Sequence, residues 1–179
     1  AAQATLLFGG KDFQMVNNAD WLRSLKLLEF LRDIGKHFSV NAMLQRDSVK
    51  NRIESQEQGI SYTEFSYMLL QAFDFLHLHS SLSVNVQIGA SDQWGNIASG
   101  IELIRRKMGH TVYGFTSPLL INKSTGKKFG KSDEGAVWMD AKKTSPFQLY
   151  QFFLNTDDES VFELLLKLTL LPKKEIDEM

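Results

Sequence analysis

The chain has 179 residues, of which 43% are hydrophobic and 23% charged, a composition typical of one globular domain or of a domain plus part of another. Its formal net charge of −1 excludes a strongly basic protein, so any contact with nucleic acid requires a local patch. The absence of cysteine excludes disulfides and thiolate metal sites and favours a reducing compartment. No apolar run approaches the roughly 18 residues that span a bilayer.

The first part of the chain predicts helices joined by loops. Three segments are expected in order: a helix over 20–35, a shorter helix over 39–53 and a polar loop over 54–59. Ser61 and Glu64 have the spacing of a capping box, in which each side chain bonds the backbone of the other residue. They predict the start of a long helix that runs to about His79.

The middle of the chain alternates strands with helices. The expected elements are a strand over 83–89, a helix over 92–107 closed by Gly109, a strand over 111–121 broken by Pro118, and a loop over 122–135. Ser145 followed by Pro146 is typical of a helix start, and everything beyond is expected to be helical, including 160–171. This shift to all helix near residue 145 predicts a domain boundary.

Tyr67, Gln71 and Asp74 form the first candidate site. They lie at positions i, i+4 and i+7 of the expected long helix and therefore share one face. On a helix otherwise rich in apolar residues, such polar groups are costly unless they are paired. A small polar ligand such as an amino acid would suit them, and pairing with other protein groups, or solvation, is the alternative.

The second candidate site follows the first strand, over residues 87–96. Ligands of doubly wound sheets collect beyond the carboxyl ends of strands, and helix N-termini favour anions. Gly89 allows the backbone to approach a ligand closely, and Asp92 has the acceptors to bind ribose hydroxyls. The alternative is an ordinary turn in which Ser91 or Asp92 caps the next helix.

The third candidate site is the lysine-rich loop over 126–132. A phosphate-binding P-loop ending at Ser132 would need glycine where Thr125 stands, and no buried strand directly precedes the loop, so that motif is excluded. Three lysines on a glycine-rich loop still suit a polyphosphate, especially one whose charge builds in a transition state. A surface loop without a ligand remains the alternative.

Histidine and tryptophan residues offer weaker signals. His77 and His79 point to different faces of the expected helix and make a poor metal pair. The three tryptophans, Trp21, Trp94 and Trp138, are expected to serve packing.

Five segments in this order resemble the bacterial and mitochondrial tyrosyl-tRNA synthetases. They are residues 35–41 (Gly-Lys-His-Phe-Ser-Val-Asn), the helix with Tyr67, Gln71 and Asp74, residues 89–96, residues 128–132 (Lys-Phe-Gly-Lys-Ser), and 143–147 with the following 150–152. The resemblance runs from about residue 15 to the end of the chain.

The resemblance implies an α/β fold: the second half of a Rossmann-type class I synthetase catalytic domain, followed by the start of an all-helical domain. It divides the chain into a partial catalytic domain over 1–120 with part of a dimer-forming insertion, the signature loop and linker over 121–144, and the start of a helical anticodon-recognition region over 145–179. It further implies a homodimer that activates tyrosine with ATP and magnesium and transfers it to tRNA(Tyr), with no metal ligated by the protein.

The resemblance also implies roles for individual residues. Tyr67 and Gln71 would hold the tyrosine ammonium group, Asp74 would bond the phenolic hydroxyl, and Gln87 and Asn41 would lie at the same substrate site. The residues that bind the nucleotide would be Gly89, Asp92, Gln93 and Lys131. The catalytic loop residues would be Lys128, Lys131 and Ser132.

Two features depart from the family pattern. The chain lacks the His-Ile-Gly-His type signature of class I enzymes, and Ala90 stands where the family usually has glycine. Because it also lacks an initial Met and ends inside an expected helix, we expect a fragment that is catalytically incomplete alone. A bacterial cytoplasmic location is expected, with the mitochondrial matrix as the alternative. The competing functions are an RNA-binding relative without catalysis and a tryptophan-activating relative.

Overall fold

A computed structural model describes residues 2–9, 13–54, 59–121 and 137–179. The chain divides into two compact units, one of residues Val16–Pro118 and one that combines Ala1–Met15 with Leu119–Met179. Within the described ranges, no helix is both long and apolar enough to cross a membrane.

The expected helix over 20–35 is interrupted in the structure. Three short elements replace it: α2 (Ala19–Leu22), α3 (Leu27–Asp33) and the 3-10 turn η1 (Gly35–His37). Trp21 stacks on His77 of helix α6 (Tyr62–Leu82), and Phe30 packs edge-on against Phe73 of the same helix. Positions nine residues apart lie on opposite sides of a continuous helix, at about 3.6 residues per turn. The helix therefore breaks so that both rings can reach α6.

The expected helix over 39–53 is divided for the same reason, into α4 (Val40–Leu44) and α5 (Asp47–Glu54). Met43 and Val49 both enter one small apolar cluster with residues of α6. Six residues turn a continuous helix through about 240°, so the two side chains would point to different sides without a break.

Helix α6 begins as the sequence predicts. The capping box is confirmed, because Glu64 N donates to Ser61 Oγ at 3.2 Å and Ser61 N donates to Glu64 Oε2 at 3.4 Å. The helix runs somewhat beyond its expected end and is followed by Ser83 in the left-handed conformation, with φ of 57°.

The two expected strands are confirmed with shorter bounds, as β1 (Val86–Ala90) and β2 (Tyr113–Ser117). They pair in parallel and are connected through η2 (Ser91–Gln93) and helix α7 (Trp94–Met108). Gly109, with φ of 69°, ends α7 as expected. At Gly114 a Cβ would lie 2.5 Å from Ile97 Cγ2, so glycine is required where this strand meets α7.

One face of the β1–β2 pair is covered by α7, and the opposite face is not. Side chains alternate along a strand, so residues next to the covered ones point the other way. Large apolar side chains are exposed there: Val86, Ile88, Tyr113 and Phe115. This open apolar face and the adjoining strand edges offer room for further sheet elements.

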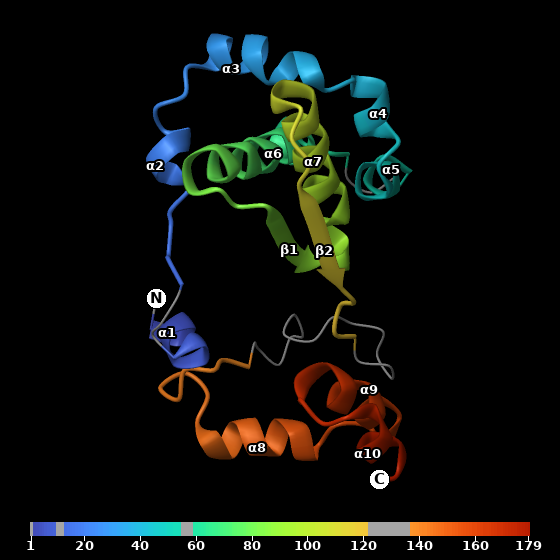
Figure 1. The fold of residues 1–179 in the computed structure, drawn as a ribbon. Helices are drawn as coiled ribbons and strands as arrows, with labels where there is room; N and C mark the ends of the chain where they lie inside the picture. Colours follow the sequence, from blue (N-terminus) through green and yellow to red (C-terminus); the bar gives the residue numbers. More distant parts are fainter. Residues whose placement is uncertain (1, 10–12, 55–58, 122–136) are drawn as a thin grey trace. The chain divides into compact units, whose positions relative to one another are not determined.

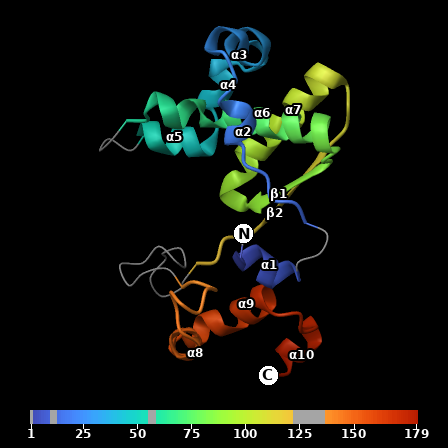
Figure 2. The same cartoon turned by 90° about the vertical axis from the view of Figure 1, so that its left-hand side faces the viewer.

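Helices α6 and α7 supply the main core of the Val16–Pro118 unit. In both ribbon views α6 lies between α3 and the β1–β2 pair (Figures 1 and 2). The buried residues of this core come from α6, α7 and the chain on either side of them: Ala72, Phe75, Leu76, Leu103, Ile104, Ile34 and Val112. Packing in this core holds α6 in place, and with it the polar stripe formed by Tyr67, Gln71 and Asp74.

The second unit is helical among its described residues. It contains α1 (Ala2–Phe8), α8 (Pro146–Leu154), α9 (Asp158–Leu168) and α10 (Lys173–Asp177). The helix start at Ser145 is confirmed as a second capping box, in which Gln148 N donates to Ser145 Oγ at 3.2 Å. The helix α1 was not predicted.

Candidate amino-acid site

Asp74 lies half-buried on α6 and accepts a hydrogen bond on each carboxylate oxygen. Trp21 Nε1 donates to Oδ1 at 2.7 Å, and Asn18 Nδ2 donates to Oδ2 at 3.2 Å. An indole N–H is a donor only, so Trp21 fixes Asp74 in the role of acceptor. Each carboxylate oxygen keeps a further lone pair, which suits a ligand that presents an O–H or N–H group.

The contacts of Asp74 reveal two residues that sequence reasoning missed. Trp21 was expected to serve packing, and that expectation covers only part of its role. Its face stacks on His77 at 4.5 Å between centroids, while its edge also bonds Asp74. Asn18 was not singled out at all. Asn17 and Asn18 place side-chain amides just before α2, but no local pattern connects them to a carboxylate more than fifty residues later.

Two buried amide oxygens have no hydrogen-bond partner among the described residues, Gln71 Oε1 on α6 and Gln87 Oε1 on β1. A buried acceptor without a donor costs about 1–3 kcal/mol. An ammonium group, which carries three donors, is a ligand that would satisfy such an oxygen. Tyr67 lies one turn before Gln71 and is exposed, so its hydroxyl is also accessible to a ligand. Gln71 Oε1 and Gln87 Oε1 are therefore free to accept from a ligand cation, as far as the described residues go.

The carboxyl end of β1 leads directly into η2 and α7. A Cβ at Gly89 would lie 3.0 Å from Gln93 Cβ and 3.2 Å from Ile97 Cδ1, so the glycine permits close packing here. Asp92 is exposed, and Gln93 Oε1 accepts a hydrogen bond from Asn96 Nδ2 at 3.4 Å. The N-cap position of α7 is Gln93 rather than Ser91 or Asp92. A helix N-terminus beyond a parallel strand is a favourable place for an anion.

The structure does not test the remaining predicted residues. Lys128, Lys131 and Ser132 lie outside the described residues. Asn41 is exposed on α4, with no side-chain hydrogen bond to the described part of the chain. Its role as a substrate contact stays a prediction.

A sequence model of the family described as tRNA synthetases class I (W and Y) matches residues 2–179. The chain belongs to this family. Similar curated proteins include tyrosine–tRNA ligase 1 of Pseudoalteromonas translucida (strain TAC 125), 56% identical over 92% of this chain and 39% of the relative. The tyrosine–tRNA ligase of Staphylococcus carnosus (strain TM300) is 57% identical over 96% of this chain and 40% of the relative.

Solved structures give the same picture of the fold. A C-terminally truncated mitochondrial tyrosyl-tRNA synthetase from Coccidioides posadasii matches with a TM-score of 0.68 and 33% identity, over 90% of this chain and 46% of that one. Its counterpart from Aspergillus nidulans matches with a TM-score of 0.67 and 35% identity, over 96% of this chain and 50% of that one. The chain thus has part of the α/β fold of a class I synthetase and spans about two fifths of the length of these curated relatives.

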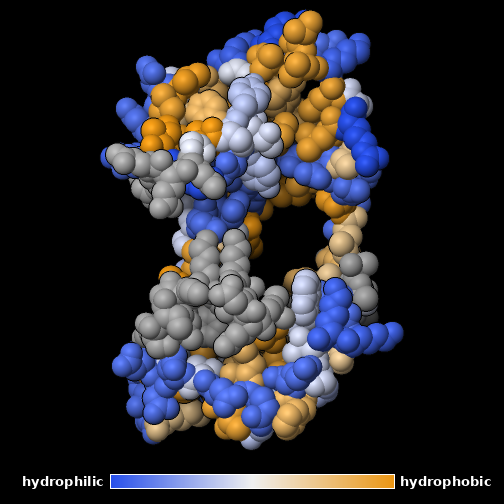
Figure 3. All heavy atoms as spheres, turned by 180° about the vertical axis from the view of Figure 1, so that it is seen from behind, coloured by the Kyte–Doolittle hydropathy of each residue, from blue (hydrophilic) through white to orange (hydrophobic). Residues whose placement is uncertain are grey.

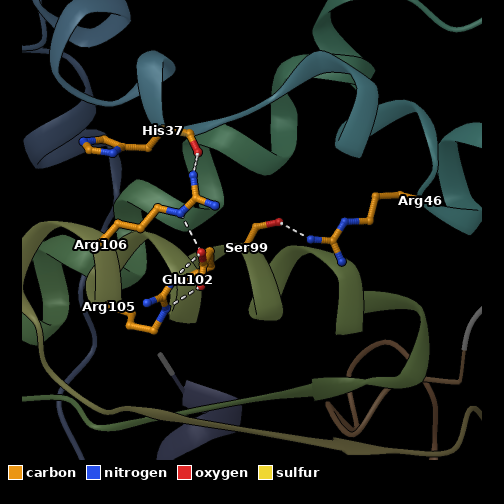
Figure 4. Close-up of polar contacts among 6 residues, drawn as sticks. All are labelled: His37, Arg46, Ser99, Glu102, Arg105 and Arg106. Atoms are coloured by element: carbon orange, nitrogen blue, oxygen red, sulfur yellow. Dashed lines mark hydrogen bonds and ion pairs between the residues drawn. The ribbon is translucent and has the colours of Figure 1, made fainter.

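A second polar cluster of this synthetase chain lies on α7, where Glu102 bonds Arg105 and Arg106 (Figure 4). Arg106 Nη1 also donates to the backbone oxygen of His37 at 2.9 Å, and Lys107 Nζ donates to that of Asp33 at 3.3 Å. The last turn of α7 is thereby tied to α3 and η1. An adjacent pocket of about 170 Å³ is lined by residues that include Phe38, Arg46, Ser99 and Glu102, and by none of the predicted site residues.

Glu102 should make the stability of the protein sensitive to acid. Hydrogen bonds from Arg105 and then Arg106 lower the pKa of Glu102 from 4.5 to about 2. A depressed folded-state pKa stabilises the fold above the unfolded value, and this contribution is lost as the pH falls from about 4.5 to 2. The side chain is 40% exposed, so solvent screening limits the effect to about 0–1 kcal/mol. Urea unfolding should show Glu102→Gln less stable than the wild type at pH 7, with the difference vanishing near pH 2.

The matched control for this acid effect is Glu29→Gln, because within the described part of the chain Glu29 pairs with the exposed Lys26 alone, at 3.5 Å. It should leave the unfolding midpoint at pH 7 unchanged. A stability difference between Glu102→Gln and the wild type that persists undiminished at pH 2 would contradict the assignment.

Proposed function

We propose that the full-length protein containing this chain is a tyrosine–tRNA ligase. The observation that carries the proposal is the polar stripe of α6. Asp74 is held as an acceptor by two donors, and one turn earlier Gln71 Oε1 is buried without a donor among the described residues. An amino acid with a hydroxyl at one end and an ammonium group at the other complements both. The names of the curated relatives support the same substrate.

In the proposed reaction the tyrosine carboxylate attacks the α-phosphate of ATP, pyrophosphate leaves, and the tyrosyl group then passes from the adenylate to tRNA(Tyr). No side chain has to attack phosphorus, so catalysis rests on positioning and on stabilising the developing charge. Tyr67, Gln71 and Gln87 are assigned to the ammonium end of tyrosine and Asp74 to its hydroxyl.

The nucleotide is assigned to the end of β1 and to the lysine loop. Gly89, Asp92 and Gln93 would contact the nucleoside, and Lys128, Lys131 and Ser132 the phosphates. Magnesium would enter with ATP, as the family resemblance implies. We place the protein in the bacterial cytoplasm, an assignment that rests on the sequence expectation alone.

Tyrosine is favoured over tryptophan because the acceptor at Asp74 needs a donor at the far end of the ring. The indole N–H of tryptophan is a donor in a different position. The alternative of an RNA-binding relative without catalysis would predict degraded site residues, whereas Tyr67, Gln71 and Asp74 are all present.

Further elements of the full-length protein are inferred to cover the open face of the β1–β2 pair. Ile88 is 71% exposed there, with three other large apolar side chains beside it. A parallel sheet is normally covered on both faces, and an apolar surface of this kind is costly in water.

Helix α3 is proposed to form part of a homodimer interface. It turns Phe30 and Ile34 toward the core and exposes an apolar face made of Leu27, Leu28 and Leu31. Figure 3 shows hydrophobic surface at the end of the unit that carries α3. Because Leu28 is 80% exposed, Leu28→Glu should convert a dimer of the full-length protein to a monomer without unfolding it. Light scattering after size exclusion would measure the mass, and circular dichroism the fold.

The control for the dimer is Leu28→Met, which keeps the apolar surface and should keep the dimer. A Leu28→Glu protein with unchanged mass at micromolar concentration would remove α3 from the interface.

ATP–pyrophosphate exchange by the full-length protein tests the proposed function, with tyrosine, phenylalanine and tryptophan supplied separately. Exchange stimulated by tyrosine alone is the expected result. Exchange stimulated by tryptophan instead would assign the protein to the tryptophan-activating branch of the family. A folded protein without exchange for any of the three would favour the RNA-binding alternative.

A further inference from the structure

The short helix α2 meets α6 through Trp21, and its N-cap residue Asn18 also donates to Asp74 at 3.2 Å. None of the residues of α2 is buried, and the Trp21 side chain contacts α6 twice: its edge bonds Asp74 and its face lies on the ring of His77. The two rings are 4.5 Å apart between centroids and 20° from parallel, which is a stacked arrangement. The position of the donor to Asp74 therefore depends on His77.

His77 itself is held in place by the aromatic residues around it. It lies one turn after Phe73 on α6, at 6.3 Å between ring centroids, and Phe73 packs edge-on against Phe30 of α3 at 5.9 Å. The ring is thus supported from within α6 and, through Phe73, from α3. Trp21 has less support from its own helix, because α2 is only four residues long and none of its residues is buried.

Since Asp74 and His77 are three residues apart on one helix, they present a carboxylate and a flat ring side by side. In the structure the Trp21 indole lies on that ring while its N–H donates to Asp74 Oδ1 at 2.7 Å. Without the ring, the indole can turn and its N–H can leave Oδ1. Asp74 then keeps the bond from Asn18 but loses the one from Trp21, so it is held less firmly in one orientation for a ligand hydroxyl.

We infer that His77 is a positioning residue for tyrosine recognition: its ring clamps Trp21, and Trp21 in turn orients Asp74 toward the phenolic hydroxyl. The inference rests on the proposed function for its consequence in catalysis, but the clamp itself is a property of the fold. His77 acts through stacking, so phenylalanine at this position should replace it and alanine should not.

The first test measures activation of tyrosine and phenylalanine by the full-length protein with His77→Ala and with His77→Phe. Loss of one aromatic stack is expected to lower the ratio of kcat/KM for tyrosine to that for phenylalanine by about two- to tenfold. The loss should appear in the tyrosine KM alone, since phenylalanine has no hydroxyl to use Asp74. His77→Phe should restore the wild-type ratio. An unchanged ratio in His77→Ala, an equal loss for both amino acids, or failure of His77→Phe to restore it would overturn the inference.

The second test detects the stacking of His77 on Trp21 without measuring enzyme activity. In the full-length protein with 15N-labelled tryptophan, the indole N–H of Trp21 is identified by its disappearance in Trp21→Phe. Its hydrogen exchange should be about two- to tenfold faster in His77→Ala and unchanged in His77→Phe. Unchanged exchange in His77→Ala would overturn the inference whatever the enzyme does. Faster exchange in a protein that activates no tyrosine would instead refute the proposed function and leave the clamp standing.

Discussion

Replacement of Asp74 by alanine in the full-length protein should abolish its preference for tyrosine over phenylalanine. Asp74 is the acceptor fixed by Trp21 and Asn18, and phenylalanine would leave it without a ligand donor. Tyrosyl synthetases are themselves the reference case for this effect, with a discrimination of about 10⁵. We expect a loss of about 10⁴–10⁵ in the ratio of the two kcat/KM values, measured by ATP–pyrophosphate exchange.

The Asp74→Asn protein separates recognition from folding. Its amide oxygen can still accept from Trp21, so α2 should stay in place, while its NH₂ group points a donor where the tyrosine hydroxyl needs an acceptor. Asp158→Ala removes an exposed carboxylate from α9 and serves as the control. It should leave kcat/KM unchanged for both tyrosine and phenylalanine. If both Asp74 variants kept the wild-type ratio within threefold, Asp74 would have no part in choosing the substrate.

Replacement of Gln71 by leucine should weaken tyrosine activation while sparing the fold. A hydrogen bond to a charged group contributes about 1.5–3 kcal/mol, which corresponds to a fall of about 10- to 100-fold in kcat/KM for tyrosine. In the free protein the same change removes a buried oxygen that has no partner among the described residues. Thermal unfolding should therefore show a Tm equal to or above that of the wild type. Gln87→Leu should behave alike for the same reason.

The matched control for these glutamines is Gln45→Leu, because Gln45 is exposed after α4. It should leave tyrosine kinetics and Tm unchanged. A Gln71→Leu protein that loses stability together with activity would show that its amide oxygen bonds another part of the protein instead of a ligand.

Local patterns determined most of the secondary structure and the helix face shared by Tyr67, Gln71 and Asp74. The capping boxes at Ser61 and Ser145 and the glycine stop at Gly109 specify their helix ends through contacts with neighbouring residues, and all three are found. The i, i+4, i+7 spacing of Tyr67, Gln71 and Asp74 depends only on helix geometry, so it also survives folding. Such features need no knowledge of distant residues.

Tertiary structure alone decided where the expected helices over 20–35 and 39–53 break and which residues complete the site. In each case two side chains that a continuous helix would separate must reach the same surface of α6. The bonds of Asn18 and Trp21 to Asp74, and the clamp by His77, join segments more than fifty residues apart. The sequence by itself determined which polar side chains share this face of α6, because residue types and helix periodicity are local. The contacts of Asn18 and Trp21 with α6 were decided only by packing, because a contact between distant segments leaves no periodic signal in the chain.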